Sequence, residues 1–251
     1  MKNLLFLDVE TTGKDEEDRI CQIAYKEQDK TAVCDVVKPP LPVKLVAMSI
    51  NNITKKMTDQ AFSFDESPHK SALLKMQDSH ILVAHNTQFD ARMLKKEGIE
   101  FTESICTFKL AHYLDKDCYL EKHNLSYLRY YFDLDIEAKA HDALGDILIL
   151  EAVFTKLFHI LRIEMQYPEN DETVIQEMIS ISSKPTLFRK APFGKYTGCL
   201  MTDIASDNVF DKKGRSWMKW LLGEKMKEEV KDEDWIYTLD YYLNAFEPVG
   251  K

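Results

Sequence analysis

The stretch LLFLDVETTG, residues 4–13, decides the fold of this chain. Its first half is an apolar run of strand-forming residues, and its second half places two carboxylates, Asp8 and Glu10, two residues apart. Side chains alternate between the two faces of a strand, so both acids project from the same face. Two like charges this close repel each other unless a cation lies between them, and hard cations such as Mg²⁺ take carboxylate oxygens. The stretch therefore predicts a strand that ends at a divalent-metal site, and residues 11–13 add hydroxyls and backbone N–H groups suited to a phosphate or a sugar hydroxyl.

The composition is that of an ordinary globular protein. The chain has 251 residues, of which 45% are hydrophobic and 30% charged, enough for one large domain or a medium domain with a small one. The five cysteines are scattered and show no C-x-x-C spacing, which argues against a disulfide framework or a zinc site and favours a reducing cytosol. With no signal-peptide pattern and no apolar run near the roughly 20 residues of a membrane span, we expect a cytoplasmic protein.

The formal net charge of −9 argues against a protein that coats nucleic acid without specificity. It does not exclude a protein that holds a single strand end at a metal site. There the cations supply the local positive charge, and a basic patch elsewhere attracts the polymer.

Strands and helices alternate along the chain after an initial group of strands. Apolar runs and turn residues predict strands at 4–10, 20–25, 30–38 and 81–84, helices at 65–76, 86–98, 124–132 and 141–158, and a strand followed by a helix at 101–112. Pro68 is expected at an early helical position, Asn86 as an N-cap, Asn124 or Ser126 as the next cap, and Gly98 at a helix end. This order predicts an α/β fold with a mixed sheet.

The pattern breaks into turn and acidic residues near Tyr167. We therefore expect a main domain over residues 1–167, a linker or connecting helix over 168–183, and a small helix-rich domain over 184–251.

Three further candidates for the chemistry lie downstream of the first strand. Asp90 follows a buried strand at the start of a helix, and His141 and Asp146 flank the start of the long apolar helix. At 100° per residue, positions 141 and 146 lie about 140° apart around a helix axis. They do not share a helical face, so we expect His141 to reach the site from the loop or first turn and Asp146 to point inward from the helix.

Taken together, the segments LFLDVETTG, HNTQFD and AHDALGD resemble the three motifs of the DEDD exonuclease superfamily, in the subgroup with a catalytic histidine. The order and separation of the segments agree with that family over about the first two-thirds of the chain. The resemblance implies a ribonuclease H-like fold, in which a five-stranded mixed sheet is flanked by helices.

The resemblance also assigns roles to individual residues. Asp8, Glu10, Asp90 and Asp146 would hold two Mg²⁺ ions, which Mn²⁺ can replace, about 3.5–4 Å apart across the attacking and leaving oxygens of a phosphodiester. His141 would act as general base, because its reference pKa of about 6.5 suits proton transfer near neutral pH.

The same resemblance predicts the substrate pocket. Glu10, Thr11 and Thr12 would lie against the terminal nucleotide and its 3′-hydroxyl, and His85, Asn86 and Phe89 would line the same pocket. For His85 a purely structural hydrogen bond is an open alternative. Residues 51–54, Asn-Asn-Ile-Thr, stand where relatives often carry His-Gly-Ile-Thr, so base contacts from this segment are not assigned.

The last quarter alternates basic and aromatic residues. The segment FGKYTG at 193–198, followed by WMKWLL at 217–222, resembles a small module at the C-terminus of exonuclease X-like proteins. Cations that track phosphates and rings that stack on bases are what single-strand binding requires. The candidate phosphate contacts are Lys190, Lys195, Lys212, Lys213, Arg215 and Lys219, with Phe193 and Tyr196 as candidate stacking residues. Trp217, Trp220 and Leu221, at helical spacing, are instead expected in the core of the small domain.

The sequence thus predicts a metal-dependent 3′→5′ exonuclease that releases nucleoside 5′-monophosphates from the 3′ end of DNA, in repair or end trimming. An exoribonuclease that trims RNA 3′ ends is the nearest alternative, since the same site serves both polymers. A polymerase-associated proofreading subunit and a non-catalytic nucleic-acid-binding protein are the others.

Overall fold

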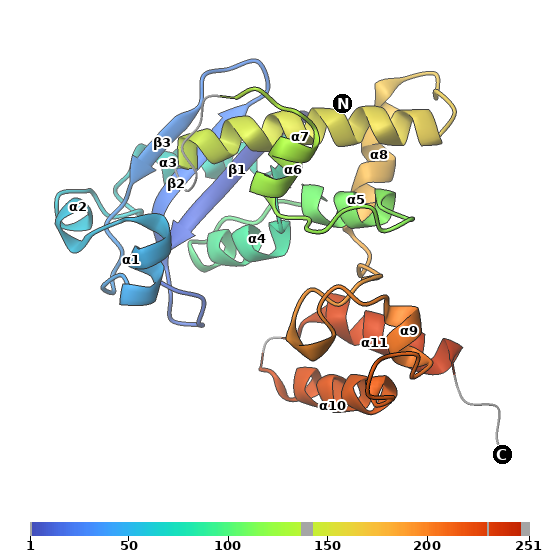
Figure 1. Ribbon diagram of the computed structural model, residues 1–251. Helices are drawn as coiled ribbons and strands as arrows, with labels where there is room; N and C mark the ends of the chain where they lie inside the picture. Colours follow the sequence, from blue (N-terminus) through green and yellow to red (C-terminus); the bar gives the residue numbers. More distant parts are fainter. Residues whose placement is uncertain (1, 137–142, 230, 247–251) are drawn as a thin grey trace. The chain divides into compact units, whose positions relative to one another are not determined.

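A computed structural model of the chain describes residues 2–136, 143–229 and 231–246 (Figure 1). Contacts between residues divide the chain into two compact units. The first contains residues 1–110 and 124–183, and the second contains residues 111–123 and 184–251. The predicted division at residue 184 therefore misses one feature, because a segment from the middle of the chain also belongs to the second unit.

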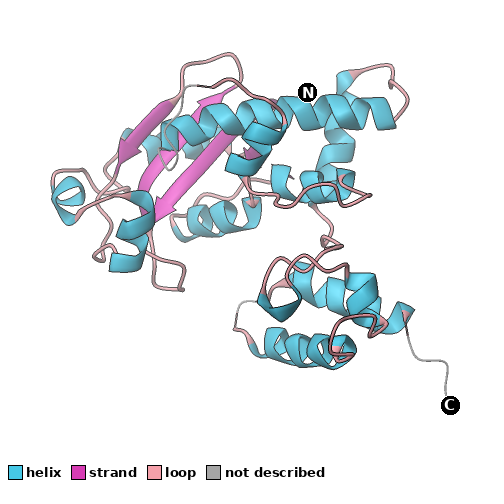
Figure 2. Ribbon diagram, in the orientation of Figure 1, coloured by secondary structure: helices cyan, strands magenta, loops and turns pink. Residues whose placement is uncertain are grey.

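A five-stranded mixed sheet forms the centre of the first unit (Figure 2). Its strands are β1 (Asn3–Thr11), β2 (Ile20–Glu27), β3 (Val33–Val36), β4 (His80–Ala84) and β5 (Ser104–Cys106), in the order β3-β2-β1-β4-β5. β1 lies at the centre, antiparallel to β2 and parallel to β4. The predicted mixed sheet of the ribonuclease H-like fold is confirmed.

Helices lie on the sheet and beyond its ends. Those of the first unit are α1 (Leu45–Asn51), α2 (Lys55–Asp59), α3 (Pro68–Met76), α4 (Thr87–Lys96), α6 (Leu125–Tyr131), α7 (Ala143–Glu164) and α8 (Asp171–Ser182). A further helix, α5 (Thr107–Leu114), begins in the first unit and ends in the second. Figure 1 shows the long helix α7 lying across the sheet over β1, β2 and β3.

The two faces of β1 are buried against different helices. Leu5, Leu7 and Val9 point into a core that includes Met93 and Leu94 of α4. The alternate residues face α7, where the Phe6 and Phe154 rings meet edge to face at 5.4 Å between centroids. Burial on both faces explains why β1 is apolar without interruption from Leu4 to Leu7.

Helix boundaries agree with the predicted signals, with one exception. Pro68 begins α3, Gly98 follows α4 with a φ of 80°, and Asn124 caps α6 by accepting the Tyr127 amide at 2.8 Å. Asn86 does stand at the N-cap of α4, but its side chain makes no capping hydrogen bond and its φ is 73°. Asparagine is one of the few residues that adopt this left-handed conformation readily, so its role here is to turn the backbone between β4 and α4.

The predicted connecting segment at 168–183 is largely the helix α8, and it belongs to the first unit. Its apolar face is buried, and the Ser182 hydroxyl accepts a hydrogen bond from the Cys106 amide of β5 at 2.8 Å.

The second unit is helical, with a 3₁₀ turn η1 (Gly194–Tyr196) and helices α9 (Met201–Ala205), α10 (Gly214–Lys227) and α11 (Glu233–Ala245). Tyr196 is fully buried in its core and meets Trp217 edge to face. Tyr196 is therefore not available to stack on a base, as the sequence predicted. Trp220 corrects a second prediction: it is 59% exposed rather than part of the core, whereas Leu221 is buried as expected.

Residues 111–123 are held in the second unit by polar and aromatic contacts. Arg189 donates to the His112 carbonyl at 2.8 Å, and the Phe188 ring packs against the His112 ring. Within residues 2–136, 143–229 and 231–246, no helix has both the length and the hydropathy needed to cross a membrane.

We expect the sheet core to dominate the stability of the first unit. Leu82 of β4 is completely buried, so Leu82→Ala should lower the free energy of unfolding by about 2–5 kcal/mol, the usual cost of such a cavity. Leu45→Ala is the matched control, because Leu45 is 81% exposed and its loss should change stability by less than about 0.5 kcal/mol. Urea denaturation of both variants measures the difference, and equal midpoints would contradict this account of the core.

Candidate active site

Asp8 and Glu10 lie at the carboxyl-terminal end of β1, on the face that α7 covers. They continue the alternation that places Phe6 against α7, as the sequence predicted for two acids on one face. Burial of the carboxyl group, followed by the charges of Glu10 and Asp146, raises the pKa of Asp8 to about 7. Asp8 thus lies close enough to both other acids to feel their negative charge.

Asp90 comes to the same place from the first turn of α4. Its side chain is almost fully buried, and its Oδ1 accepts a hydrogen bond from the Val9 amide of β1 at 3.2 Å. Burial and then the charge of Asp8 raise the pKa of Asp90 well above its usual value, although the Val9 hydrogen bond opposes them. This hydrogen bond therefore fixes Asp90 of α4 against β1, the strand that carries Asp8 and Glu10.

Asp146 is in the first turn of α7 and is partly buried. Its charge contributes to the raised pKa of Asp8, so the structure gathers the predicted acids Asp8, Glu10, Asp90 and Asp146 from β1, α4 and α7. His141, the predicted general base, lies outside the described residues.

The acid group fits a divalent cation on the chemistry of its donors. It offers carboxylate oxygens, the ligands of Mg²⁺ and related hard ions, and burial followed by repulsion from the neighbouring acids raises the pKa values of Asp8 and Asp90. A bound cation would remove that repulsion.

A pocket of about 480 Å³ opens beside Glu10. β1 contributes Val9, Glu10 and Thr11, and Phe89 of α4 lines it as predicted. The pocket is completed by Gly13, Lys14, Asp15, Lys44, Val46, Ala47, Ile50 and Asn51. It therefore has charged groups along one side and apolar side chains of α1 along another, which suits a nucleotide with its polar sugar phosphate and flat apolar base.

The contribution of α1 was missed by the sequence analysis. Val46, Ala47 and Ile50 line the pocket at helical spacing, in a part of the chain where the sequence analysis predicts no helix or strand. Asn51 ends the helix, donates to the Thr11 carbonyl at 3.3 Å and accepts from the Ile53 amide at 3.0 Å. Asn51, the first residue of the Asn-Asn-Ile-Thr segment, thus lines the pocket and also holds the end of β1 through the Thr11 carbonyl.

The other predicted pocket residues have different surroundings. Thr12 is fully buried, and its hydroxyl donates to the carboxylate of Asp18 at 2.7 Å, so its side chain supports the loop after β1 rather than lining the pocket. His85 is hydrogen-bonded through Nδ1 to the Thr107 hydroxyl at 2.9 Å, which agrees with the structural alternative. Asn86 is exposed at the turn before α4.

Lys195, the predicted substrate contact of the second unit, forms an ion pair with Asp211 at 2.9 Å and lies over the Tyr196 ring. Two other candidate cations also bond within that unit: Lys190 donates to the Cys118 carbonyl, and Arg215 donates to the Leu243 carbonyl at the end of α11.

Comparisons with known proteins agree with the fold. Residues 5–154 match the exonuclease family model RNase_T. Exodeoxyribonuclease 10 of Escherichia coli strain K12 is 27% identical over 215 residues, which cover 83% of each chain.

Among solved structures, exonuclease X in complex with 5′ overhanging duplex DNA is 26% identical, with a TM-score of 0.55 over 72% of this chain and 99% of that one. Cell-death related nuclease 4 (CRN-4) is 19% identical, with a TM-score of 0.51 over 64% of each chain, and shares the fold. With three motifs in order, the sheet expected for them and a family match over most of the first unit, this chain belongs to the RNase T exonuclease family and is a 3′→5′ exonuclease of the DEDD type with a catalytic histidine.

Proposed function

We propose that this protein is a metal-dependent exonuclease that removes nucleoside 5′-monophosphates one at a time from the 3′ end of DNA. The observation that supports this most directly is the burial of Asp8 and Asp90 beside Glu10 and Asp146, which is unfavourable for the metal-free protein. Ionisable groups whose pKa values are strongly shifted in this way are typical of functional sites.

The four acids are the residues proposed to hold two Mg²⁺ ions, with Mn²⁺ as a substitute. When bound, such ions lower the pKa of a coordinated water and neutralise charge on a phosphodiester. The part proposed for the protein itself is to hold these carboxylates from β1, α4 and α7 near one another and to bind the terminal nucleotide between Phe89 and α1. His141, immediately before α7, is the proposed general base that takes a proton from the attacking water.

DNA is the proposed polymer because the similar chains are an exodeoxyribonuclease and a nuclease in complex with duplex DNA. RNA remains the competing substrate, since discrimination depends on how the pocket near Glu10 and Thr11 treats a 2′-hydroxyl. End trimming or repair in the cytoplasm is the proposed setting, and five free cysteines are consistent with a reducing compartment.

The second unit is proposed to bind the nucleic acid through part of the basic set that the sequence predicts, with Trp220 in place of Tyr196 as the stacking residue. Residues 184–219 contain eight lysines and arginines but three acids, in a chain of net charge −9. Lys213 stands at the N-cap of α10, and Lys219 and Trp220 are neighbours within the helix. Lys212, Lys213, Lys219 and the largely exposed Trp220 offer cations and a ring at the surface. Lys195, at 43% side-chain exposure, is retained as a weaker contact because Asp211 already pairs with it.

Cleavage of 5′-labelled single-stranded DNA with Mg²⁺ tests the reaction. We expect a ladder that shortens from the 3′ end, abolished by EDTA and restored by Mg²⁺ or Mn²⁺. Asp8→Asn should lower the rate by about 10³-fold or more, because it removes a proposed metal ligand. RNA of the same sequence should be shortened more slowly.

Asp29→Asn is the matched control for the same change of acid to amide. Asp29 is exposed in the turn after β2, where asparagine tolerates its φ of 61°, so this variant should retain full activity. His141→Asn should slow cleavage by about 10²–10⁴-fold. A wild-type protein that leaves both polymers intact would refute the proposed reaction, whereas faster loss of RNA would reassign its substrate.

The Asp8→Asn substitution should also stabilise the metal-free protein. In EDTA at pH 8, Asp8→Asn should raise the free energy of unfolding by on the order of 1–3 kcal/mol, because it removes a buried charge that repels Glu10 and Asp146. A carboxyl whose pKa rises from 3.8 to about 7 on folding destabilises the fold increasingly through that pH range, so the difference should widen as pH rises. Thermal melts should also show Mg²⁺ stabilising the wild type far more than the variant. A variant less stable than the wild type in EDTA would contradict the electrostatic argument.

Binding of labelled oligo(dT) in EDTA tests the surface of α10. Lys213→Gln with Lys219→Gln should weaken binding and reduce the slope of log K against log salt by about 0.7 for each lost phosphate contact. Trp220→Ala should weaken binding with little change in that slope, because stacking carries no charge. The charge-matched control is Lys75→Gln with Lys156→Gln, two exposed lysines of the first unit. Equal affinity and slope in both double variants would remove this surface from the proposal.

A further inference from the structure

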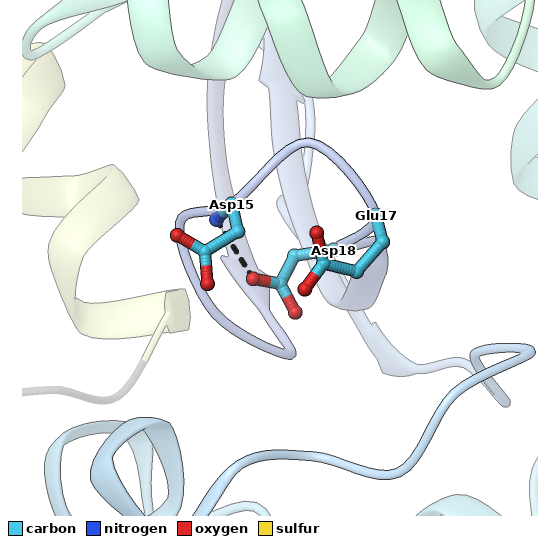
Figure 3. Close-up of side chains that lie close together, drawn as sticks. All are labelled: Asp15, Glu17 and Asp18. Carbon is cyan, nitrogen blue, oxygen red and sulfur yellow. Dashed lines mark hydrogen bonds between the residues drawn. The ribbon is translucent and has the colours of Figure 1, made fainter. Parts of the chain in front are cut away.

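The loop that follows β1 carries four acids in succession, Asp15 to Asp18, yet it is tightly held. It spans residues 13–19 and forms one side of the pocket through Gly13, Lys14 and Asp15. The carboxylates of Asp15, Glu17 and Asp18 lie within 4.8 Å of one another (Figure 3), the only such acid group found among the described residues.

Lys44, at the N-cap of α1, explains why these acids lie together. Its ammonium bonds Asp15 at 2.7 Å, Asp18 at 2.8 Å and Glu17 at 3.1 Å. These hydrogen bonds raise the pKa of Lys44 above its usual value. A single ammonium therefore bonds all three carboxylates and offsets one of their three negative charges, and this shared partner accounts for their arrangement without a metal ion.

Asp18 is the centre of this cluster. Its side chain is 1% exposed, its Oδ1 accepts from the Thr12 hydroxyl at 2.7 Å, and its Oδ2 accepts from the Asp15 amide at 2.8 Å as well as from Lys44. Although burial raises its pKa, the hydrogen bonds from Lys44, Thr12 and Asp15 outweigh burial and keep the pKa of Asp18 below the usual value. The ionised carboxylate of Asp18 thus connects the loop, Lys44 at the start of α1, and Thr12 directly after β1.

Gly13 is required by the same carboxylate. A Cβ atom at this position would lie 2.4 Å from Asp18 Oδ2 and 2.8 Å from its Cγ, closer than real contacts allow. The last residue of the Glu-Thr-Thr-Gly segment therefore leaves the space that Asp18 occupies.

Two cations of α4 hold the loop from another side through its backbone. Arg92 donates to the Lys14 carbonyl at 3.1 Å, and Lys96 donates to the carbonyls of Glu16 at 2.6 Å and Asp15 at 3.1 Å. The loop is consequently fixed by α1 through its carboxylates and by α4 through its carbonyls. These two helices also supply the pocket lining opposite β1.

We propose that Asp18 and Lys44 are positioning residues for the terminal nucleotide. They fix the loop as a rigid side of the pocket, and they fix the end of β1, because Thr12 bonds Asp18 through its hydroxyl and accepts the Lys44 amide through its carbonyl at 3.0 Å. Loosening this cluster should weaken nucleotide binding more than the chemical step. This inference rests on the proposed function in that the pocket receives the 3′-terminal nucleotide.

Steady-state cleavage of DNA separates binding from chemistry. Lys44→Gln and Asp18→Asn should each raise KM by about tenfold while kcat changes by less than about threefold. Lys44→Arg should restore most of the loss, because a guanidinium can still pair with the carboxylates. Lys70→Gln is the control, since it breaks another lysine–aspartate pair, with Asp65, at the first unit's surface.

A double-mutant cycle tests the contact between Gly13 and Asp18 directly. Gly13→Ala alone should raise KM, whereas in an Asp18→Ala background it should add almost nothing, because the new methyl group then fills the space that the carboxylate left. Additive effects on KM would contradict the proposed contact. Thermal melts identify any variant that fails to fold. Because the Lys44 side chain is 41% exposed, we expect Lys44→Gln to fold, so the proposal can be tested with this variant even if the others unfold.

Binding of dTMP by calorimetry provides a readout that is independent of cleavage. Weaker dTMP binding in Lys44→Gln would support the positioning role even if the wild type left DNA intact, which would reject the proposed function alone. An active wild type, together with unchanged KM and dTMP affinity in Lys44→Gln, Asp18→Asn and Gly13→Ala, would reject the positioning role alone. A wild type that neither cleaves DNA nor binds dTMP would reject both.

Discussion

Repulsion among the carboxylates at the end of β1 is the constraint on which the rest of the first unit depends. The shared burial of Asp8 and Asp90 raises both pKa values, so the folded chain holds together charges that would separate in a flexible structure. A site of this kind requires a rigid support that is stabilised elsewhere.

That support is the central strand. β1 has a strand on each side and a helix layer on each face, so its end cannot shift without disturbing the core. The Val9 amide holds Asp90, and the Lys26–Glu151 ion pair between β2 and α7 holds the helix that carries Asp146. Asp90 is thus attached to β1, and the helix of Asp146 to β2, by interactions that are separate from the repulsion between the acids, which is how the fold keeps them together.

Much of this could be predicted from local sequence. Alternation placed Asp8 and Glu10 on one face of a strand, and Pro68, Gly98 and Asn124 marked helix ends, because these effects depend on residues close together in the chain. The role of Asp18 could not be read in the same way. Its partners Thr12 and Lys44 are 6 and 26 residues away, and only the folded chain brings them to one point. Trp220 was misplaced for a related reason, since helical spacing alone does not show which face of α10 meets a neighbour.

The cluster around Asp18 also bears on how an acidic chain approaches a polyanion. Four acids in the loop beside the pocket would add to the negative charge of Asp8, Glu10, Asp90 and Asp146 and repel a phosphate backbone. Lys44 bonds three of their carboxylates and offsets one negative charge, and Arg92 and Lys96 add positive charge while bonding the loop's carbonyls. With Lys14 and Arg19 these cations number five, which equals the four acids of the loop together with Glu10, so the formal charges on this side of the pocket balance although the chain carries a net charge of −9. The interactions that give the loop its shape therefore also remove its charge, and one set of residues serves both the geometry of the pocket and its electrostatic compatibility with a nucleic acid.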